Sequence, residues 1–223
     1  MSREWQRLSA VPPERRIYID LDDVLAETTR HIVDLLNARF ARSVAFHELD
    51  DFDLGRCFDL DPEQHAHAMR CVHEEPFLLG LPVREGAQDV LRTWAASGYH
   101  LAVITGRPPE THEVSCDWLR THDVPHHSIH CIDKYGRYGA HSEHTSLDLL
   151  RAFPFEIAIE DSPEMARFLV EHSGGTVLLM DRPWNRAHPL LEGDSTDRIL
   201  RVHTWSEIAT ELRTRAPRAS ARL

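Results

Sequence analysis

The sequence predicts an α/β protein: a Rossmann-like, doubly wound parallel sheet with a small helical cap inserted after the first strand. Three observations favour this fold. Short apolar segments alternate with longer helical patterns, which is typical of βαβ units and a parallel sheet. Polar or acidic residues follow directly after several apolar segments. A long, mostly polar stretch over residues 28–83 separates the first apolar segment from the second.

Composition and charge restrict the class of protein. The chain has 223 residues, of which 42% are hydrophobic and 27% are charged, as in ordinary globular proteins. No apolar segment reaches the roughly 18 residues that a membrane span needs. The first residues lack the apolar core of a signal peptide, so we expect a cytoplasmic protein. A net charge of −11 argues against a nucleic acid polymer as partner, whereas a bound divalent cation would let a small anion approach.

Cysteine and histidine give no indication of a zinc site. The four cysteines form no CxxC pair, which favours reduced thiols. The sixteen histidines include no HExxH motif and no finger-like spacing with cysteine, so surface histidines are the favoured interpretation. A homodimer is compatible with the sequence, but nothing in the sequence determines the oligomeric state.

The first half of the chain predicts one strand and then the cap. After a tail over residues 1–15, an apolar segment that starts at residue 17 predicts the first strand. Ile32, Leu36 and Phe40 recur at four-residue spacing on one face of a helix. Asp61 and Pro62 begin a second helical segment, with proline at the first helical position. We therefore expect residues 28–83 to form the helical cap.

From residue 84 onward, helices and strands alternate. Expected strands lie within residues 100–108, 128–134, 156–162 and 176–181, and expected helices within residues 84–98, 110–122, 146–153, 163–175 and 204–215. Trp94 and Trp118 lie on the apolar faces of two of these helices and are predicted to be core residues. The α/β core thus comprises residues 16–27 and 84–213, and residues 214–223 form a second tail.

Charged and polar residues follow four of the expected strands. These residues are Asp20 and Asp22, then Thr105 and Gly106, then Asp133 and Lys134, and finally Glu160 and Asp161. Because the carboxyl ends of parallel strands meet at one edge of the sheet, we expect these side chains to lie together. The sequence therefore predicts a functional site at this edge.

This set of side chains suits phosphoryl transfer with Mg²⁺. The carboxylates of Asp20 and Asp161 are hard oxygen ligands for Mg²⁺. The Thr105 hydroxyl, nearby backbone N–H groups and Lys134 can hold phosphate oxygens. An aspartate nucleophile can form an aspartyl-phosphate, and a second carboxyl two residues on can protonate the leaving oxygen and later activate water. The alternative is that Asp22 and Asp23 merely cap the following helix.

Four motifs resemble those of the haloacid dehalogenase (HAD) superfamily of phosphohydrolases. "DLDDVL" resembles the first motif, DxDx[VT][LV], and "VIT" resembles the second. Lys134 stands where the third motif is expected, and "IEDS" resembles the acidic fourth. Two flanking stretches, "EEPFLLGLPVREGAQDVL" and "LLMDRPWNR", resemble the 5'(3')-deoxyribonucleotidase branch. The resemblance covers residues 16–213.

The resemblance implies a role for each matching residue. Asp20 would be the nucleophile and a Mg²⁺ ligand, and Asp22 the acid/base, which binds the metal through its backbone carbonyl. Asp161 would be the remaining protein ligand, and Glu160 beside it is also counted as a residue of the metal site. Thr105, the backbone at Gly106, and Lys134 would grip the phosphate. The cap would exclude water and select the substrate.

The sequence departs from the pattern of the branch at three points. Asp23 stands where glycine is frequent, and Thr28 stands where an aromatic residue is frequent. The interval between Lys134 and Asp161 is lengthened by "YGRYGAHSEHTS". An alternative to Lys134 is therefore that Arg107, or a histidine such as His141 or His144, takes the place of the motif-three lysine.

The expected function is a Mg²⁺-dependent phosphomonoesterase that acts through an aspartyl-phosphate, in the manner of a 5'-nucleotidase on nucleoside monophosphates. A phosphatase for another small phosphorylated metabolite and a catalytically silent binding module on the same fold are the alternatives. Four aromatic residues of the cap, Phe46, Phe52, Phe58 and Phe77, either line a base pocket or form the cap's own core. Trp184 and Arg186 belong either to a structural turn or to a loop that faces the substrate.

Overall fold

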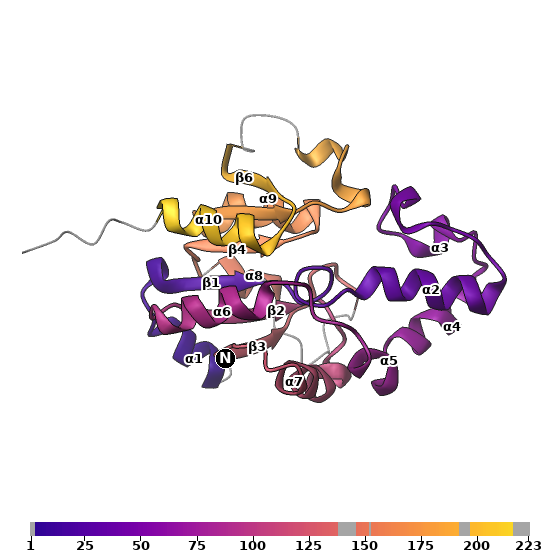
Figure 1. Ribbon diagram of the computed structural model, residues 1–223, viewed down its shortest axis with the longest axis horizontal. Coiled ribbons are helices and arrows are strands. Elements are labelled where there is room, and N and C mark those ends of the chain that lie inside the picture. Colours follow the sequence, from indigo (N-terminus) through magenta and orange to yellow (C-terminus); the bar gives the residue numbers. More distant parts are fainter. Residues whose placement is uncertain (1–2, 138–145, 152, 192–196, 216–223) are drawn as a thin grey trace, which may run out of the picture.

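The computed structural model describes residues 3–137, 146–151, 153–191 and 197–215, and it confirms the predicted doubly wound parallel sheet. Its six strands pair in parallel in the order β3-β2-β1-β4-β5-β6 (Figure 1). The strands are β1 (Arg16–Ile19), β2 (His100–Thr105), β3 (Ser128–Cys131), β4 (Ile157–Glu160), β5 (Thr176–Met180) and β6 (Ile199–Val202). The chain reverses direction of travel across the sheet between β3 and β4, so β1 lies at the centre.

Helices cover both faces of the sheet. On one face lie α6 (Ala87–Ala96), α7 (His112–Thr121) and α10 (Trp205–Arg215), and on the other lie α1 (Arg3–Ser9), α8 (Leu147–Arg151) and α9 (Pro163–Ser173). The alternation along β1 shows why: Ile17 and Ile19 pack in the first hydrophobic cluster and Tyr18 in the second. Trp94 and Trp118 are buried in the first cluster, as predicted. Within the described ranges, no helix has the length and apolar character needed to cross a membrane.

The segment between β1 and α6 forms a lobe beside the sheet (Figure 1). It contains α2 (Thr28–Phe40), α3 (Leu54–Cys57), α4 (Pro62–Val72) and α5 (Glu75–Leu79). Asp61 caps α4 through bonds from the backbone N–H groups of Glu63 and Gln64, with Pro62 at the first position. The lobe has a hydrophobic cluster of its own, which includes Leu36 and Phe58. We call residues 28–83 the cap.

Short 3₁₀ helices complete the described structure. They are η1 (Pro13–Arg15), η2 (Phe46–Glu48), η3 (Pro109–Thr111), η4 (Pro183–Asn185) and η5 (Pro189–Leu191). Of these, η2 belongs to the cap, whereas η4 follows β5 and so stands at the same edge of the sheet as the predicted site.

The N-terminal segment differs from the prediction of a tail over residues 1–15. Residues 3–9 form helix α1, whose Trp5 and Leu8 side chains are fully buried. The Trp5 ring lies 4.2 Å from the ring of His130 and 4.6 Å from that of Phe153. Two large apolar side chains three residues apart thus cover the face of the sheet beside β3, and this burial outweighs the polar character of the segment. Of the predicted second tail over residues 214–223, the first two residues belong to helix α10, and the rest lies outside the described residues.

Candidate active site

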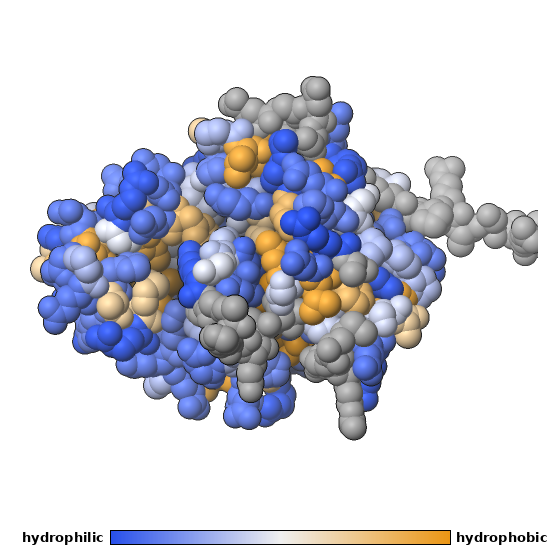
Figure 2. Space-filling view, turned by 180° about the vertical axis from the view of Figure 1, so that it is seen from behind, coloured by the Kyte–Doolittle hydropathy of each residue, from blue (hydrophilic) through white to orange (hydrophobic). Residues whose placement is uncertain are grey.

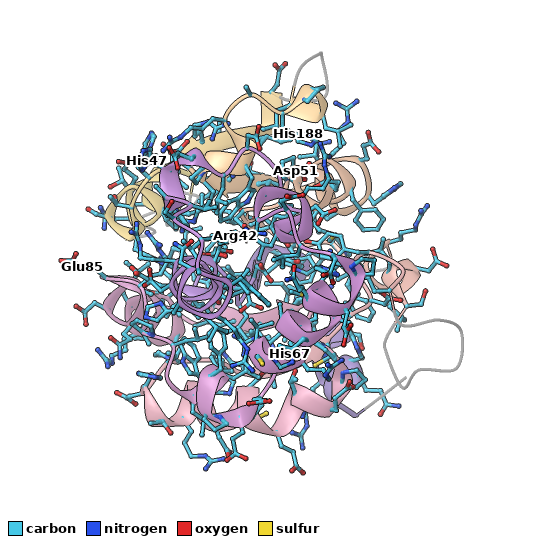
Figure 3. The ribbon with its side chains drawn as sticks, turned by 90° about the vertical axis from the view of Figure 1, so that its right-hand side faces the viewer. Arg42, His47, Asp51, His67, Glu85 and His188 are labelled. Carbon is cyan, nitrogen blue, oxygen red and sulfur yellow. The ribbon has the colours of Figure 1, made fainter. Side chains whose placement is uncertain are left out.

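The register of the central strands brings the predicted site residues to one edge. Ile19 pairs with Val103 on one side and with Ile159 on the other, so the residues that follow these strands emerge together. A cavity of about 980 Å³ lies between this edge and the cap and is lined from both. In Figure 3, which looks at this end of the molecule, the labelled cap residues Arg42, Asp51 and His67 lie in front of the sheet edge. Seen from behind, apolar surface is visible on the cap and at its border with the core (Figure 2).

Lys134 stands at the centre of the strand ends. Its Nζ donates to Asp20 Oδ1 at 2.7 Å and to Glu160 Oε1 at 2.5 Å, and its side chain is almost completely buried. A Cβ atom at Gly106 would lie 3.3 Å from Tyr135 Cε2, which is a tight contact, and 3.4 Å from Lys134 Cδ, so the backbone at Gly106 packs directly against this segment. The structure thus brings Lys134 to the place where the third motif was predicted. Three residues were considered as substitutes for the motif-three lysine. His141 and His144 lie outside the described residues, and Arg107 pairs with Asp22 instead.

Glu160 is held entirely by donors from the protein. It is fully buried, and its Oε1 accepts from the Tyr18 hydroxyl at 2.6 Å as well as from Lys134. Its Oε2 accepts from the backbone N–H groups of Asp161 at 3.0 Å and Ser162 at 3.2 Å. Because both oxygens are engaged, we expect Glu160 to orient Lys134 rather than to bind a cation. We call Asp20, Lys134, Glu160 and Asp161 the strand-end cluster.

The charges in the strand-end cluster do not balance. Three buried carboxylates face one ammonium group, and ligand atoms of Asp20, Glu160 and Asp161 lie within 4.8 Å of one another. Burial, together with repulsion from Glu160 and Asp22, raises the pKa of Asp20 to about 8 despite the nearby Lys134. Burial and repulsion from Asp20 also raise the pKa of Asp161 well above its usual range. An excess of hard oxygen donors in a buried position fits a divalent cation of the Mg²⁺ type.

Asp22 is paired with Arg107. The guanidinium approaches the carboxylate with Nε at 3.1 and 3.0 Å from its two oxygens and with Nη2 at 2.7 Å from Oδ1. Arg107 is itself held by Ser115, and Thr28 donates to Asp22 Oδ1 at 2.6 Å. Burial alone would raise the pKa of Asp22, but Arg107, with the Thr28 hydroxyl and Lys134, outweighs it, so this pKa lies below its usual range. Thr28 thus has a defined partner at a position where the related branch often has an aromatic residue.

The two residues predicted to bind phosphate after β2 differ in position. Gly106 lines the cavity. Thr105 is fully buried behind it, and its Oγ1 accepts from the backbone N–H of Arg107 at 3.1 Å. The threonine therefore fixes the loop that carries Gly106 and Arg107. Sequence reasoning considered Arg107 only as a substitute for the lysine, although its position directly after Thr105 and Gly106 was a signal for a site residue.

Asp23 caps the helix that begins the cap. Its carboxylate accepts from the backbone N–H of Thr29 at 3.1 Å and from its hydroxyl at 2.5 Å, whereas Glu27 at the N-cap position makes no side-chain cap bond. Its backbone has φ of 58°, in the left-handed region, and its carbonyl accepts from the Arg182 guanidinium. The capping alternative therefore holds for Asp23, while Asp22 faces Arg107. Burial raises the pKa of Asp23 to about 6.

The cap lines the cavity with polar side chains, among them Asp51, Arg70 and Glu74, and with apolar ones. We call five of the apolar residues the cap wall: Ile32, Phe52, Leu54, Met69 and Val72. Of the aromatic residues considered from the sequence, Phe52 lines the cavity, and Phe58 is buried in the hydrophobic cluster of the cap, against which Phe46 and Phe77 also pack. Trp184 lines the cavity as well, whereas Arg186 pairs with Asp181 at 2.9 Å.

Comparisons with known proteins agree with this geometry. The family described as "5' nucleotidase, deoxy (Pyrimidine), cytosolic type C protein" matches residues 15–217. "Putative nucleotidase BH1399" of Halalkalibacterium halodurans is 23% identical over 197 residues, which cover 88% of this chain and 92% of that protein. A HAD family hydrolase from Deinococcus radiodurans R1, with bound phosphate and sodium, is 19% identical with a TM-score of 0.55, over 90% of this chain and 96% of that one. YfnB from Bacillus subtilis, bound to magnesium, is 14% identical with a TM-score of 0.53. The match covers 89% of this chain and 98% of YfnB.

Proposed function

Because the chain belongs to the family of cytosolic type C 5' nucleotidases and is a phosphohydrolase of the HAD superfamily, we propose that it is a Mg²⁺-dependent phosphomonoesterase acting on nucleoside monophosphates. The reaction would pass through an aspartyl-phosphate on Asp20. The observation that carries the proposal is the strand-end cluster, in which Lys134 holds Asp20 at 2.7 Å at the floor of a cavity large enough for a nucleotide.

The donor set supports a divalent cation at this floor. Carboxylate oxygens of Asp20 and Asp161 would bind it, together with the backbone carbonyl of Asp22 implied by the family resemblance. Glu160 would remain the partner of Lys134, since its oxygens already accept four hydrogen bonds. When bound, Mg²⁺ would neutralise the excess negative charge and that of the phosphoryl oxygens. The magnesium-bound YfnB structure, which has the same fold, supports this choice of metal.

The reaction would then proceed in two half-reactions, in which Asp20 and Asp22 take different roles. In the first, a carboxylate oxygen of Asp20 attacks phosphorus while the bond to the leaving oxygen breaks, and Asp22 gives that oxygen a proton. In the second, Asp22 takes a proton from water, whose oxygen attacks the aspartyl-phosphate and releases phosphate and the Asp20 carboxylate. Arg107 holds Asp22 by two nitrogens and so fixes its orientation in both halves. A phosphate dianion beside Asp22 disfavours its charged form, so substrate binding itself promotes the protonation that the first half requires.

The cap supports a nucleoside as the leaving group. The apolar cap wall faces the strand-end cluster across the cavity and offers surface for a base or sugar. The backbone N–H groups at Gly106 and the ammonium of Lys134 would hold the phosphate at the other end, with Thr105 supporting the loop. The description of the family and the name of BH1399 point to the same class of substrate.

Phosphate release from a panel of substrates tests the proposal. The panel contains nucleoside monophosphates and sugar phosphates, each with Mg²⁺ and with EDTA, and the Asp20→Asn variant runs beside the wild type. We expect the wild type to hydrolyse nucleotides with Mg²⁺ only, and the variant to lose activity by a factor on the order of 10⁴ or more. Hydrolysis of other phosphomonoesters alone would reject the nucleotide substrate but keep the mechanism. Equal activity of the variant would reject Asp20 as the nucleophile.

A further inference from the structure

Trp184 belongs to the core by its place in the chain and to the cap by its packing. It lies in η4, just after β5, at the carboxyl edge of the sheet. Its buried indole nevertheless joins the hydrophobic cluster of the cap, together with residues of α2 and α4. The rings of Phe46 and Phe52 meet it edge to face, at 5.8 Å and 82° and at 5.7 Å and 85°. Both phenylalanines come from the cap, so two cap residues fix the plane of the indole.

The polar end of the same indole holds Asp161. Trp184 Nε1 donates to Asp161 Oδ2 at 3.1 Å in a buried position. The neighbouring Asn185 holds the backbone of that residue, because its Nδ2 donates to the Asp161 carbonyl and to the Met180 carbonyl, both at 2.8 Å. The backbone of Asp161 is thus fixed within the core, whereas the orientation of its carboxylate depends on the indole. A second partner of this kind determines how well a carboxylate presents its other oxygen to a cation.

We propose that Trp184 is a positioning residue that couples the cap to the cation site, an inference that rests on the proposed function. The cap side chains Phe46 and Phe52 hold the indole in the orientation in which its N–H aligns Asp161. Cation affinity therefore depends on the packing of the cap against the core, although no cap residue belongs to the strand-end cluster. Removing the N–H donor of Trp184 and removing the contact of Phe52 with its ring should therefore both weaken cation binding by misaligning the Asp161 carboxylate.

Two single variants test the two contacts of Trp184 separately, and a third variant is the control. Trp184→Phe keeps an aromatic ring in the cap cluster but removes the N–H donor. Phe52→Leu keeps an apolar side chain but removes one ring edge from Trp184, at a position that is 39% exposed and so tolerant of change. Leu190→Ala is the matched control, since Leu190 is 40% exposed but lies outside the cavity lining. The double variant Trp184→Phe/Phe52→Leu closes a mutant cycle.

The measurement is the dissociation constant for Mn²⁺ alone, followed by the electron paramagnetic resonance signal of the free ion with the full-length protein. Mn²⁺ prefers the same oxygen ligands as Mg²⁺. We expect Trp184→Phe to weaken binding by about tenfold or more, Phe52→Leu to weaken it by a smaller factor, and Leu190→Ala to leave it unchanged. We expect the double variant to bind no more weakly than Trp184→Phe. Thermal unfolding of each variant verifies that it is folded.

With a wild type that binds Mn²⁺, three results would overturn the coupling. They are an unchanged Mn²⁺ dissociation constant in folded Trp184→Phe, an unchanged one in folded Phe52→Leu, and additive weakening in the double variant, which would mean that Phe52 acts independently of the indole. None of these results affects the proposed function, which is tested by nucleotide hydrolysis of the wild type. Conversely, coupling with no hydrolysis of any nucleotide would reject the substrate and keep the role of Trp184. Failure of the wild type to bind Mn²⁺ would overturn both the coupling and the metal requirement.

Discussion

The two sides of the cavity are built on different principles. On the core side, each residue of the strand-end cluster is at least nine-tenths buried and lies at the end of a strand of the sheet or shortly after it. On the opposite side, the cap wall is apolar, comes from helices and from the segment before α3, and includes the partly exposed Phe52. The backbone hydrogen bonds of the sheet fix the register of the first side, whereas the second is built on short helices that pack around the hydrophobic cluster of the cap.

This difference separates chemistry from substrate choice. Charged groups in the strand-end cluster act on the phosphoryl group, which all phosphomonoesters share. Apolar groups in the cap wall can contact only the part of the substrate that varies. We therefore expect changes in the cluster to affect all substrates equally, and changes in the cap wall to affect discrimination between substrates. The predictions below test this separation.

The largest effect on stability is expected for Lys134→Met. This change leaves the carboxylates of Asp20 and Glu160 buried without their counter-charge, which should destabilise the fold by about 3–5 kcal/mol and reduce activity on every substrate by a factor on the order of 10³. Urea unfolding and phosphate release measure the two losses. The control is Arg137→Met, which removes an exposed positive charge from the lining of the same cavity. Equal losses in both variants would mean that general charge, rather than the buried pair, accounts for the effect.

A smaller effect, and one that depends on pH, is expected for Asp20→Asn. Because the pKa of Asp20 is about 8 in the folded protein and about 4 when unfolded, folding takes up a proton between these values. The stability contributed by the protonated form is therefore lost as the pH rises from about 4 to about 8. Without Mg²⁺, we expect the variant to be more stable than the wild type at pH 8, by on the order of 2 kcal/mol, and equally stable near pH 4.

Urea unfolding at several pH values, with EDTA and with Mg²⁺, measures this difference. A bound cation lowers the pKa of a nearby carboxyl, so Mg²⁺ should reduce the advantage of the variant at pH 8. A constant difference between the two proteins across this pH range would contradict the raised pKa. If the variant is instead less stable than the wild type at pH 8, the attraction between Asp20 and Lys134 stabilises the fold by more than burial of the Asp20 charge destabilises it.

The core side could be predicted from the sequence, and the reasons are physical. Four short apolar segments, each followed by polar or acidic residues, require one arrangement if the sheet is parallel, because all carboxyl ends meet at the same edge. Lys134 and Asp20 therefore meet although they are far apart in the chain. The helix face that includes Ile32 and Leu36 was equally readable from its spacing.

The contacts that cross between core and cap could not be predicted in this way. The sequence left Trp184 open between a structural turn and a substrate-facing loop, and the structure places it in the turn η4, where it lines the cavity and donates to Asp161. The pairing of Arg107 with Asp22 likewise depends on how two loops are oriented, which periodicity does not encode. Helix α1 escaped prediction because its seven residues carry a short apolar pattern, with Trp5 and Leu8 as its main signal.

In the cap wall, Met69→Ala should change the discrimination between substrates without changing the rate of phosphoryl transfer. The loss of the flexible thioether removes apolar contact with the variable part of the substrate. We expect KM for nucleoside monophosphates to rise by about fivefold, a loss of about 1 kcal/mol, while kcat/KM for a small phosphomonoester such as glycerol phosphate stays the same. Steady-state kinetics on both substrates gives the ratio of their kcat/KM values for the variant and for the wild type. An equal loss on both would mean that the cap wall also positions the strand-end cluster.

The smallest net effect is expected at Asp23, where core and cap join and two effects oppose each other. Asp23→Gly removes the bonds that cap α2, which costs about 1 kcal/mol, but it also relieves the left-handed backbone, which gains about 1 kcal/mol. Asp23→Ala loses the cap bonds and keeps the strain, so it should be less stable than Asp23→Gly by about 1 kcal/mol. Urea unfolding of the two variants isolates this backbone contribution, since neither has a capping side chain. If alanine and glycine are equally stable, the left-handed conformation carries no cost, and glycine at this position in relatives has another cause.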